Sequence, residues 1–383
     1  MILDEALAVA RKLADEQLRP RKQQIDESGE WPRDSLRALQ AAGLGGLVVP
    51  SDAGGQGHGL LAVARVCDVL AFECPSTAIS YGMHLVGSAV VAAKATAAQR
   101  RQYLEPIARG EHLTTLALSE PGTGSHFYLP ETTLARSSDG YVLHGTKTFV
   151  TSGGYADSYV MSAAPVGAAA PPGEFSCVVV PNHARGLQWA SDWNGWGMRG
   201  NAARSVQLDH VRIDRDDLLG DEGDEIWFVF NVVAPFFLVA MAGTYLGIAA
   251  AALAAARDHL LERRHAHTGL RLADQPIVQH RFGTLWAELL RTRALVWDAA
   301  RMGDDGDPDA LPALCSAKAE VAITAEHITT EAMTLLGGRG YGNGHPLQRM
   351  YRDARAAHVM APPTDLLRTW TGRAVLGLPI LGE

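Results

Sequence analysis

The 383-residue chain has few cysteines, no excess of basic residues and no signal-like order in its first twenty residues, and each of these features argues against a class of protein. Its four cysteines are scattered and form no C-x-x-C pair, which excludes a disulfide scaffold or a cysteine zinc site. Acidic residues outnumber basic ones, giving a net charge of -8, so a nucleic-acid-binding surface is not expected. The first twenty residues lack the basic-then-apolar order of a secretory signal. We therefore expect a cytoplasmic protein.

Charge is also missing from one long internal run. About thirty residues from Ile226 to Ala256 carry no charged side chain, which exceeds the ~20 apolar residues that span a bilayer. Against a membrane helix stand Asn231 and Pro235 within the run and the acidic sequence DEGDE directly before it. Gly243 and Gly247 allow close helix contact in either solvent. A membrane span and a buried core helix both remain open on these residues alone.

The stretch from Leu116 to Gly154 carries the clearest chemical signal. Alternating runs at 116–119 and 141–150 predict two strands, and turn residues follow each of them. Gly122, Gly124 and Ser125 predict a tight turn whose backbone N–H groups face a ligand. Phe149 and Thr151 are two residues apart and are expected on one face of a strand. An aromatic ring beside a hydroxyl suits a flat heteroaromatic cofactor.

Two motifs in this stretch resemble those of the acyl-CoA dehydrogenase flavoprotein family. The family pattern T-E-P-x-x-G-S-D is read here as S-E-P-G-T-G-S-H at 119–126, and N-G-x-K-x-W-I-T-N-G-G as H-G-T-K-T-F-V-T-S-G-G at 144–154. The resemblance implies that Phe149 covers the flavin ring of FAD and that Thr151 bonds near flavin N5. The other FAD-binding residues that it implies in this stretch are Leu116, Leu118, Ser119, Gly124 and Ser125.

Later motifs extend the resemblance over nearly the whole chain. Arg264 and His267 fall in a version of the family's E-R-x-x-F-G motif, and Gly338 in its L-G-G-x-G-Y turn, and both regions are implied to meet the FAD of a neighbouring subunit. The implied fold is α+β, with an N-terminal helical domain (1–113), a central small β-barrel or sandwich domain (114–221) and a C-terminal four-helix bundle (222–383). The run at 226–256 becomes a buried bundle helix without a membrane. A homodimer or homotetramer and an electron-transferring flavoprotein partner are expected.

The pattern breaks where the family carries its catalytic base. The usual glutamate of Y-E-G-T is replaced by Ala361, and the earlier helix that bears the base in some members has no carboxylate at 234–238. A base of suitable pKa is needed to remove the proton beside a thioester. The weak substitutes are Asp365, His84, His126 and His358.

Three hypotheses follow from a kept cofactor site and a changed substrate site. The first is FAD-dependent α,β-dehydrogenation of an acyl thioester, carried by CoA or a carrier protein, with an unusual or relocated base. The second is a flavin-dependent monooxygenase on the same fold, and the third is a non-catalytic subunit of a heteromeric dehydrogenase. No metal site is predicted, since the H-x-H of His265 and His267 has no third ligand nearby in the sequence.

Overall fold

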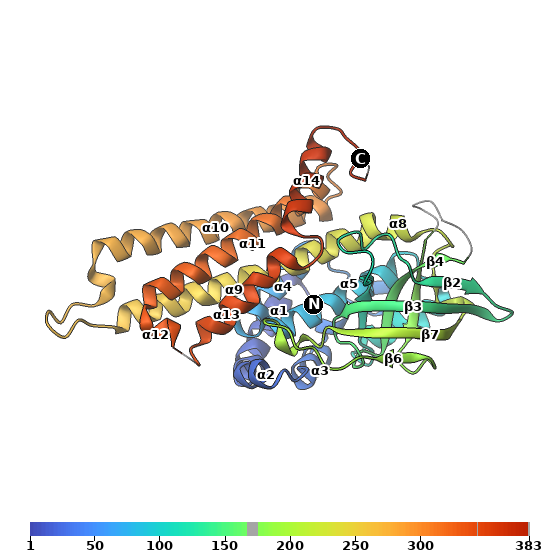
Figure 1. Cartoon of the computed structure of the whole chain (residues 1–383), viewed down its shortest axis with the longest axis horizontal. Coiled ribbons are helices and arrows are strands. Elements are labelled where there is room, and N and C mark those ends of the chain that lie inside the picture. Colours follow the sequence, from blue (N-terminus) through green and yellow to red (C-terminus); the bar gives the residue numbers. More distant parts are fainter. Residues whose placement is uncertain (167–174, 343, 382–383) are drawn as a thin grey trace.

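One mixed sheet lies at one end of the molecule, beside helices from both halves of the chain, as Figure 1 shows. The computed structural model describes residues 1–166, 175–342 and 344–381. The sheet has eight strands and lies between residues 114 and 219 of the chain. The predicted α+β class and the order of helices, sheet and helices are therefore confirmed.

The N-terminal helices form a layer in which α5 is almost completely buried. A capping box is present at α6, where Thr96 and Gln99 exchange side-chain and backbone hydrogen bonds. The helices are α1 (Leu3–Leu13), α2 (Lys22–Ser28), α3 (Arg33–Ala41), α4 (Leu60–Glu73), α5 (Pro75–Ala93), α6 (Ala97–Gln99) and α7 (Glu105–Ala108).

The sheet has the order β6-β7-β3-β2-β4-β5-β8, and β1 pairs with β4 in parallel. Its longest pairing joins β3 and β7, which are antiparallel and are interrupted by two shifts of register. Such bulges redirect side chains. One lies between Leu143 and Gly145, and the other lies between Lys147 and Val150. The strands are β1 (Thr114–Ala117), β2 (Thr133–Arg136), β3 (Gly140–Val150), β4 (Ser158–Pro165), β5 (Ser176–Pro181), β6 (Leu187–Trp189), β7 (Arg204–Asp214) and β8 (Leu218–Leu219).

Long helices from the second half of the chain run side by side away from the sheet (Figure 1). Pro235 follows directly after a π-helical turn (Val229–Val233) in a helix that continues from α8 into α9, so its missing N–H falls where the regular α-helical hydrogen bonding is already interrupted. The helices are α8 (Glu225–Phe228), α9 (Ala234–Glu262), α10 (Pro276–Asp304), α11 (Ala310–Leu336), α12 (Gly338–Tyr341), α13 (Pro346–Val359) and α14 (Thr364–Val375).

Helix α9 is long and apolar because α4 and its neighbours cover it. A Cβ added at Gly243 would lie 2.2 Å from the carbonyl oxygen of Ala64, and one at Gly247 would lie 2.4 Å from that of Asp68. Glycine at these two positions therefore lets the two helix backbones meet. Among the residues that the structure describes, two helices are long and apolar enough to cross a membrane, but their apolar windows are 89% buried in α5 and 61% buried from α8 through α9. The protein's own core accounts for both.

Candidate functional site

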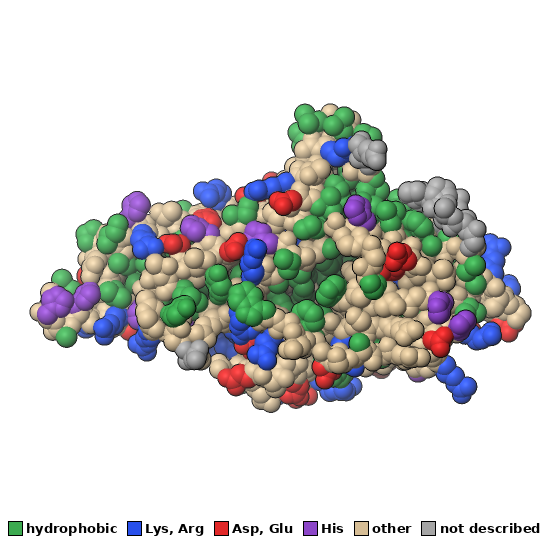
Figure 2. All heavy atoms as spheres, in the orientation of Figure 1, with side chains coloured by type: hydrophobic (Ala, Val, Ile, Leu, Met, Phe, Trp, Pro, Cys, Tyr) green, Lys and Arg blue, Asp and Glu red, His purple; other side chains and the backbone are tan. Residues whose placement is uncertain are grey.

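A cavity of about 770 Å³ lies between the sheet and the helices. Figure 2 shows the surface hollowed near the middle of the molecule, where hydrophobic side chains gather. Seven of the ten predicted FAD-binding residues line this one cavity, although they come from β1, the turn after it and the end of β3. They are Leu116, Leu118, Ser119, Gly124, Ser125, Phe149 and Thr151. We call the side of the cavity that these seven residues form the floor.

Phe149 reaches the cavity through an irregular strand end. Its φ of 54° lies in the left-handed region, and the pairing with β7 shifts between Lys147 and Val150. The ring is 66% exposed, in a T-shaped contact with Trp193 at a centroid distance of 6.2 Å, whereas Thr151 is buried. The expected strand alternation is therefore wrong as the reason for their placement. The bulge, which the sequence did not reveal, brings both residues to the cavity.

The floor offers unused hydrogen-bonding groups to a ligand. The Oγ1 atom of Thr148 is buried and has no hydrogen-bond partner within the described part of the chain. A Cβ at Gly124 would meet nothing within 4 Å, so the backbone there is open to close approach. The Thr115 hydroxyl donates to the carbonyl oxygen of Thr151 at 3.0 Å and fixes that residue. An exposed ring, an orphaned hydroxyl and an open turn fit a flat, polar-edged ring system such as a flavin.

A buried ion pair holds the floor in shape. The Nζ atom of Lys147 lies 2.5 Å from Oε1 of Glu120 and donates to the carbonyl oxygen of Ser162 at 2.6 Å. The other carboxylate oxygen, Oε2, accepts from the backbone N–H groups of Glu131 and Thr132 at 2.7 and 3.0 Å. Burial lowers the pKa of Lys147, while Glu120 favours its charged form. Both residues stand in the two sequence motifs, but their pairing was not predicted.

The opposite side of the cavity, which we call the wall, is formed almost entirely by apolar side chains. It comes from the start of α9 and from the end of α13 with the segment after it. The residues are Val233, Ala234, Phe237, Leu238, Met241, Ala356, Val359, Met360, Ala361, Pro362 and Pro363. An acyl chain, and not a charged group, suits this surface.

A second buried lysine fixes the path of the wall. The Nζ atom of Lys318 donates to the carbonyl oxygens of Ala357, Met360 and Pro362 at 2.8, 3.1 and 2.8 Å. It thereby satisfies carbonyls that the end of α13 leaves without helical partners. Burial lowers the pKa of Lys318 to about 7. Sequence analysis missed this residue because its partners are backbone atoms about forty positions away.

Within the described ranges, no free base lines the cavity. Glu120 is the one lining residue, among those the structure describes, with an ionisable side chain, and its carboxylate is already bound by Lys147 and two N–H groups. Ala361 lies in the lining at the place where the family's glutamate is expected.

The substitute bases lie elsewhere. His84 is buried in α5, where one ring nitrogen lies 3.0 Å from the Gly45 carbonyl oxygen and the other accepts from the Thr114 N–H at 3.2 Å. Burial lowers its pKa to about 4, so it is a neutral core histidine. His126 and Asp365 are exposed, and neither lines the cavity. None of these three residues is therefore placed to act as a base in the cavity.

His358 also fails to reach the cavity. Its Nδ1 atom lies 3.1 Å from the Thr364 hydroxyl, and its Nε2 atom lies 3.0 Å from the Glu326 carboxylate. The ring is thus engaged between α11 and the start of α14. His358 is therefore not placed to act as a base in the cavity either.

The remaining predicted FAD-binding residues lie at the far end of the long helices (Figure 1). Arg264 and His267 belong to the segment between α9 and α10, where the Arg264 guanidinium donates to the Gly269 carbonyl oxygen at 2.9 Å. Gly338 begins α12, and a Cβ there would meet nothing within 4 Å. None of the three lines the floor, so their predicted contact with a neighbouring subunit's cofactor stays a prediction.

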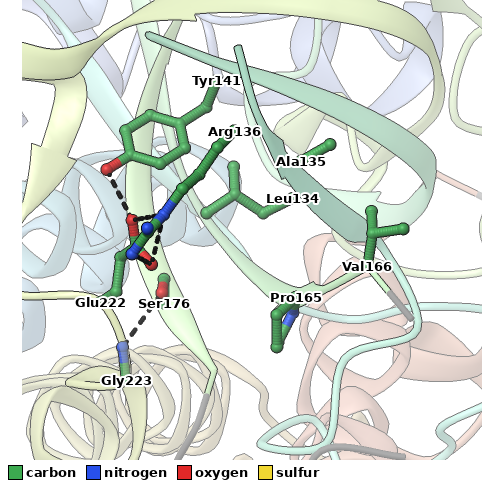
Figure 3. A pocket seen from close by; sticks show the side chains of 9 residues that line it. All are labelled: Leu134, Ala135, Arg136, Tyr141, Pro165, Val166, Ser176, Glu222 and Gly223. Carbon is green, nitrogen blue, oxygen red and sulfur yellow. Dashed lines mark hydrogen bonds and ion pairs between the residues drawn. The ribbon is translucent and has the colours of Figure 1, made fainter. Parts of the chain in front are cut away.

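A second hollow of about 510 Å³ lies beside the ends of strands β2, β4 and β5, and Figure 3 shows the residues that line it. Its ionisable groups satisfy one another, because Arg136 donates to both oxygens of Glu222 and the Tyr141 hydroxyl donates to the same carboxylate at 2.9 Å. With its charges paired and its polar groups used, this hollow offers less to a ligand than the first cavity.

Comparison with known proteins gives a consistent result across the chain. Models of the N-terminal, middle and C-terminal domains of acyl-CoA dehydrogenase match residues 4–111, 115–211 and 239–376. A cyclohex-1-ene-1-carbonyl-CoA dehydrogenase of Geobacter metallireducens is 29% identical over 374 residues, which cover 97% of each chain. The mitochondrial isobutyryl-CoA dehydrogenase of Dictyostelium discoideum is 27% identical over 361 residues, covering 94% of this chain and 86% of its own.

The fold is also found among solved structures. The butyryl-CoA dehydrogenase of Megasphaera elsdenii superposes with a TM-score of 0.92 at 24% identity and covers 98% of each chain. At this identity the structural likeness establishes the fold alone.

Proposed function

This chain belongs to the acyl-CoA dehydrogenase family, and from that premise we propose that it binds FAD on the floor of the cavity and dehydrogenates an acyl thioester at Cα–Cβ. It is an oxidoreductase that acts on CH–CH groups. The observation that carries the assignment of FAD is the convergence of seven predicted flavin residues on one cavity whose other side is apolar.

Each side of the cavity has a task in this reaction. Bound FAD would accept the hydride that leaves the substrate's β-carbon. Phe149 would cover the ring, and Thr151, whose backbone carbonyl is held by the Thr115 hydroxyl, would donate at the ring edge. The apolar wall aligns the acyl chain and excludes water, which favours transfer between two closely held groups.

Removal of the α-proton is where the chain departs from its family. No lining side chain among the described residues is a free base, so the α-proton would pass to a base supplied from solution at the mouth of the cavity. This favours an acyl group that carries a second carbonyl on its α-carbon and a hydrogen on its β-carbon, because its α-proton is acidic enough for a weak base and a hydride can still leave the β-carbon. An electron-transferring flavoprotein is the proposed acceptor of the electrons.

Anaerobic reduction of bound flavin tests the proposal. The flavin-loaded protein is mixed with saturated acyl groups and with activated acyl groups that bear a second carbonyl on the α-carbon, each on CoA and on a carrier protein. The visible flavin absorption should bleach with an activated acyl thioester and more slowly with a saturated one. A panel without any bleaching would contradict the dehydrogenase.

The wall without a base also supports a second candidate, a flavin monooxygenase on this fold. Such an enzyme needs a reductase and oxygen but no α-proton acceptor. Oxygen consumption coupled to an oxygenated product, in the presence of a flavin reductase, would favour it. Retention of one FAD per subunit, with no such product, would exclude it.

A further inference from the structure

Two neighbouring strands place three metal-ligating side chains together on the surface of the sheet. His144 lies on β3, and Asp209 and His210 lie on β7. Along β7 buried and exposed residues alternate except at Asp209 and His210, which are both exposed between the buried Leu208 and Val211. The alternation is broken there by a bulge.

The register explains how the bulge gathers the three residues. Leu143 pairs with Val211 and Gly145 pairs with Leu208, so the single residue His144 lies opposite the two residues Asp209 and His210. His210 has a φ of 53°, which few residues other than glycine adopt. The sequence could not reveal this cluster, because 65 residues separate its two parts and only the pairing unites them.

The side chains are close enough to share one ion. One ligand atom from each residue lies within 4.8 Å of the other two, and the two imidazole rings have centroids 5.0 Å apart. The Oδ1 atom of Asp209 lies 2.7 Å from Nδ1 of His210. In the metal-bound site this hydrogen bond would be replaced by coordination of the carboxylate oxygen and a ring nitrogen to one ion.

We propose that His144, His210 and Asp209 form a surface site for a divalent late first-row transition metal ion such as Zn²⁺. Imidazole nitrogens and a carboxylate oxygen are the donors that these ions accept, and rotation of exposed side chains closes the remaining distance. Three protein ligands leave at least one position to water. None of the three residues lines the flavin cavity, so this site is independent of the proposed reaction.

A second histidine pair supplies an internal control. His265 and His267 have ring centroids 5.4 Å apart, but Nε2 of His265 lies 2.7 Å from the side-chain amide nitrogen of Gln275. Within the described ranges, they belong to no group of three possible ligands. Removing them should leave Zn²⁺ binding unchanged.

Calorimetric titration of the untagged full chain with Zn²⁺, after treatment with a chelator, tests the site. One equivalent should bind, and His144→Ala or His210→Asn should weaken its affinity by about tenfold or more. Asparagine is chosen at position 210 because it tolerates the left-handed backbone. The His265→Ala/His267→Ala variant should bind like the wild type.

Thermal unfolding with and without Zn²⁺ gives a second readout and checks that the variants fold. Zn²⁺ should raise the melting temperature of the wild type more than that of His144→Ala. No binding to the wild type, or binding that His144→Ala and His210→Asn both leave unchanged, would overturn the proposal.

Discussion

The floor and the wall of the cavity each rest on a buried lysine, but the two lysines have different kinds of hydrogen-bond partner. Lys147, behind the floor, meets the carboxylate of Glu120 at 2.5 Å. Lys318, behind the wall, meets three backbone carbonyl oxygens at 2.8 to 3.1 Å. Charge–charge pairing depends on one particular partner side chain. A backbone carbonyl, in contrast, is supplied by every residue, whatever its side chain.

This difference offers a physical reason why the floor of this chain resembles the family's motifs while the wall departs from them. Replacing a floor residue such as Glu120 would strand a buried charge, so the floor keeps its sequence motif. The wall keeps its backbone path through Lys318 whatever side chain stands between Met360 and Pro362. Ala361 could therefore replace the expected glutamate without loss of the cavity's shape, and the reaction could change while the fold stayed the same.

Loss of the floor's carboxylate should have the largest effect. Glu120→Gln removes the countercharge of a fully buried ammonium group, and we expect the free energy of unfolding to fall by about 3 to 5 kcal/mol. Urea unfolding at neutral pH measures this change. The double variant Glu120→Gln/Lys147→Met should be more stable than Glu120→Gln, because it carries no unpaired charge. A double variant that is less stable would contradict the pairing argument.

Restoring a carboxylate to the wall should convert the site toward the family's usual chemistry. Ala361→Glu places a base at the cavity, and we expect anaerobic flavin reduction by a saturated acyl-CoA to accelerate about 100-fold, or about 2.7 kcal/mol in activation free energy. Stopped-flow absorbance measures the rate. Ala361→Gln has the same size without the base and should show no acceleration. Equal rates for the two variants would show that the wall does not orient a base toward the substrate.

Removing the wall's lysine should cost less than breaking the floor's pair, and the cost should depend on pH. At pH 9 the neutral amine of Lys318 has two N–H donors for its three carbonyl partners, so Lys318→Met removes two hydrogen bonds, and we expect a loss of about 2 kcal/mol. The pKa of Lys318 is about 7 in the folded chain and 10.5 in its ordinary state. Between these values the unfolded chain binds more protons, so wild-type stability rises with pH.

The difference between wild type and Lys318→Met should therefore be smaller at pH 6 than at pH 9. Urea unfolding of both proteins at the two pH values measures it. A difference that is equal at both values would mean that Lys318 stays charged throughout, with its carbonyl partners fully offsetting its burial.

The contrast between floor and wall also marks how far the sequence could be read. The floor was predictable, because Phe149, Thr151 and Gly124 belong to local motifs whose spacing survives in the structure. The bulge at Phe149 and the partners of Lys318 were not, since they depend on strand register and on backbone atoms distant in sequence. For the same reason the four substitute bases failed, because residue type alone does not tell which way a histidine or an aspartate points.

The smallest effect is expected from one hydroxyl of the floor. Thr151→Val keeps the shape of a buried side chain and removes only its donor at the ring site, so FAD affinity should fall by about 1 kcal/mol, or about fivefold. Fluorescence quenching of FAD on titration with apoprotein measures the change. Thr146→Val lies on the same strand but outside the cavity lining, and it should leave the affinity unchanged. Equal affinities for Thr151→Val and the wild type would mean that the hydroxyl does not meet the flavin, and the floor would then hold its ligand by shape and apolar contact, as the wall does.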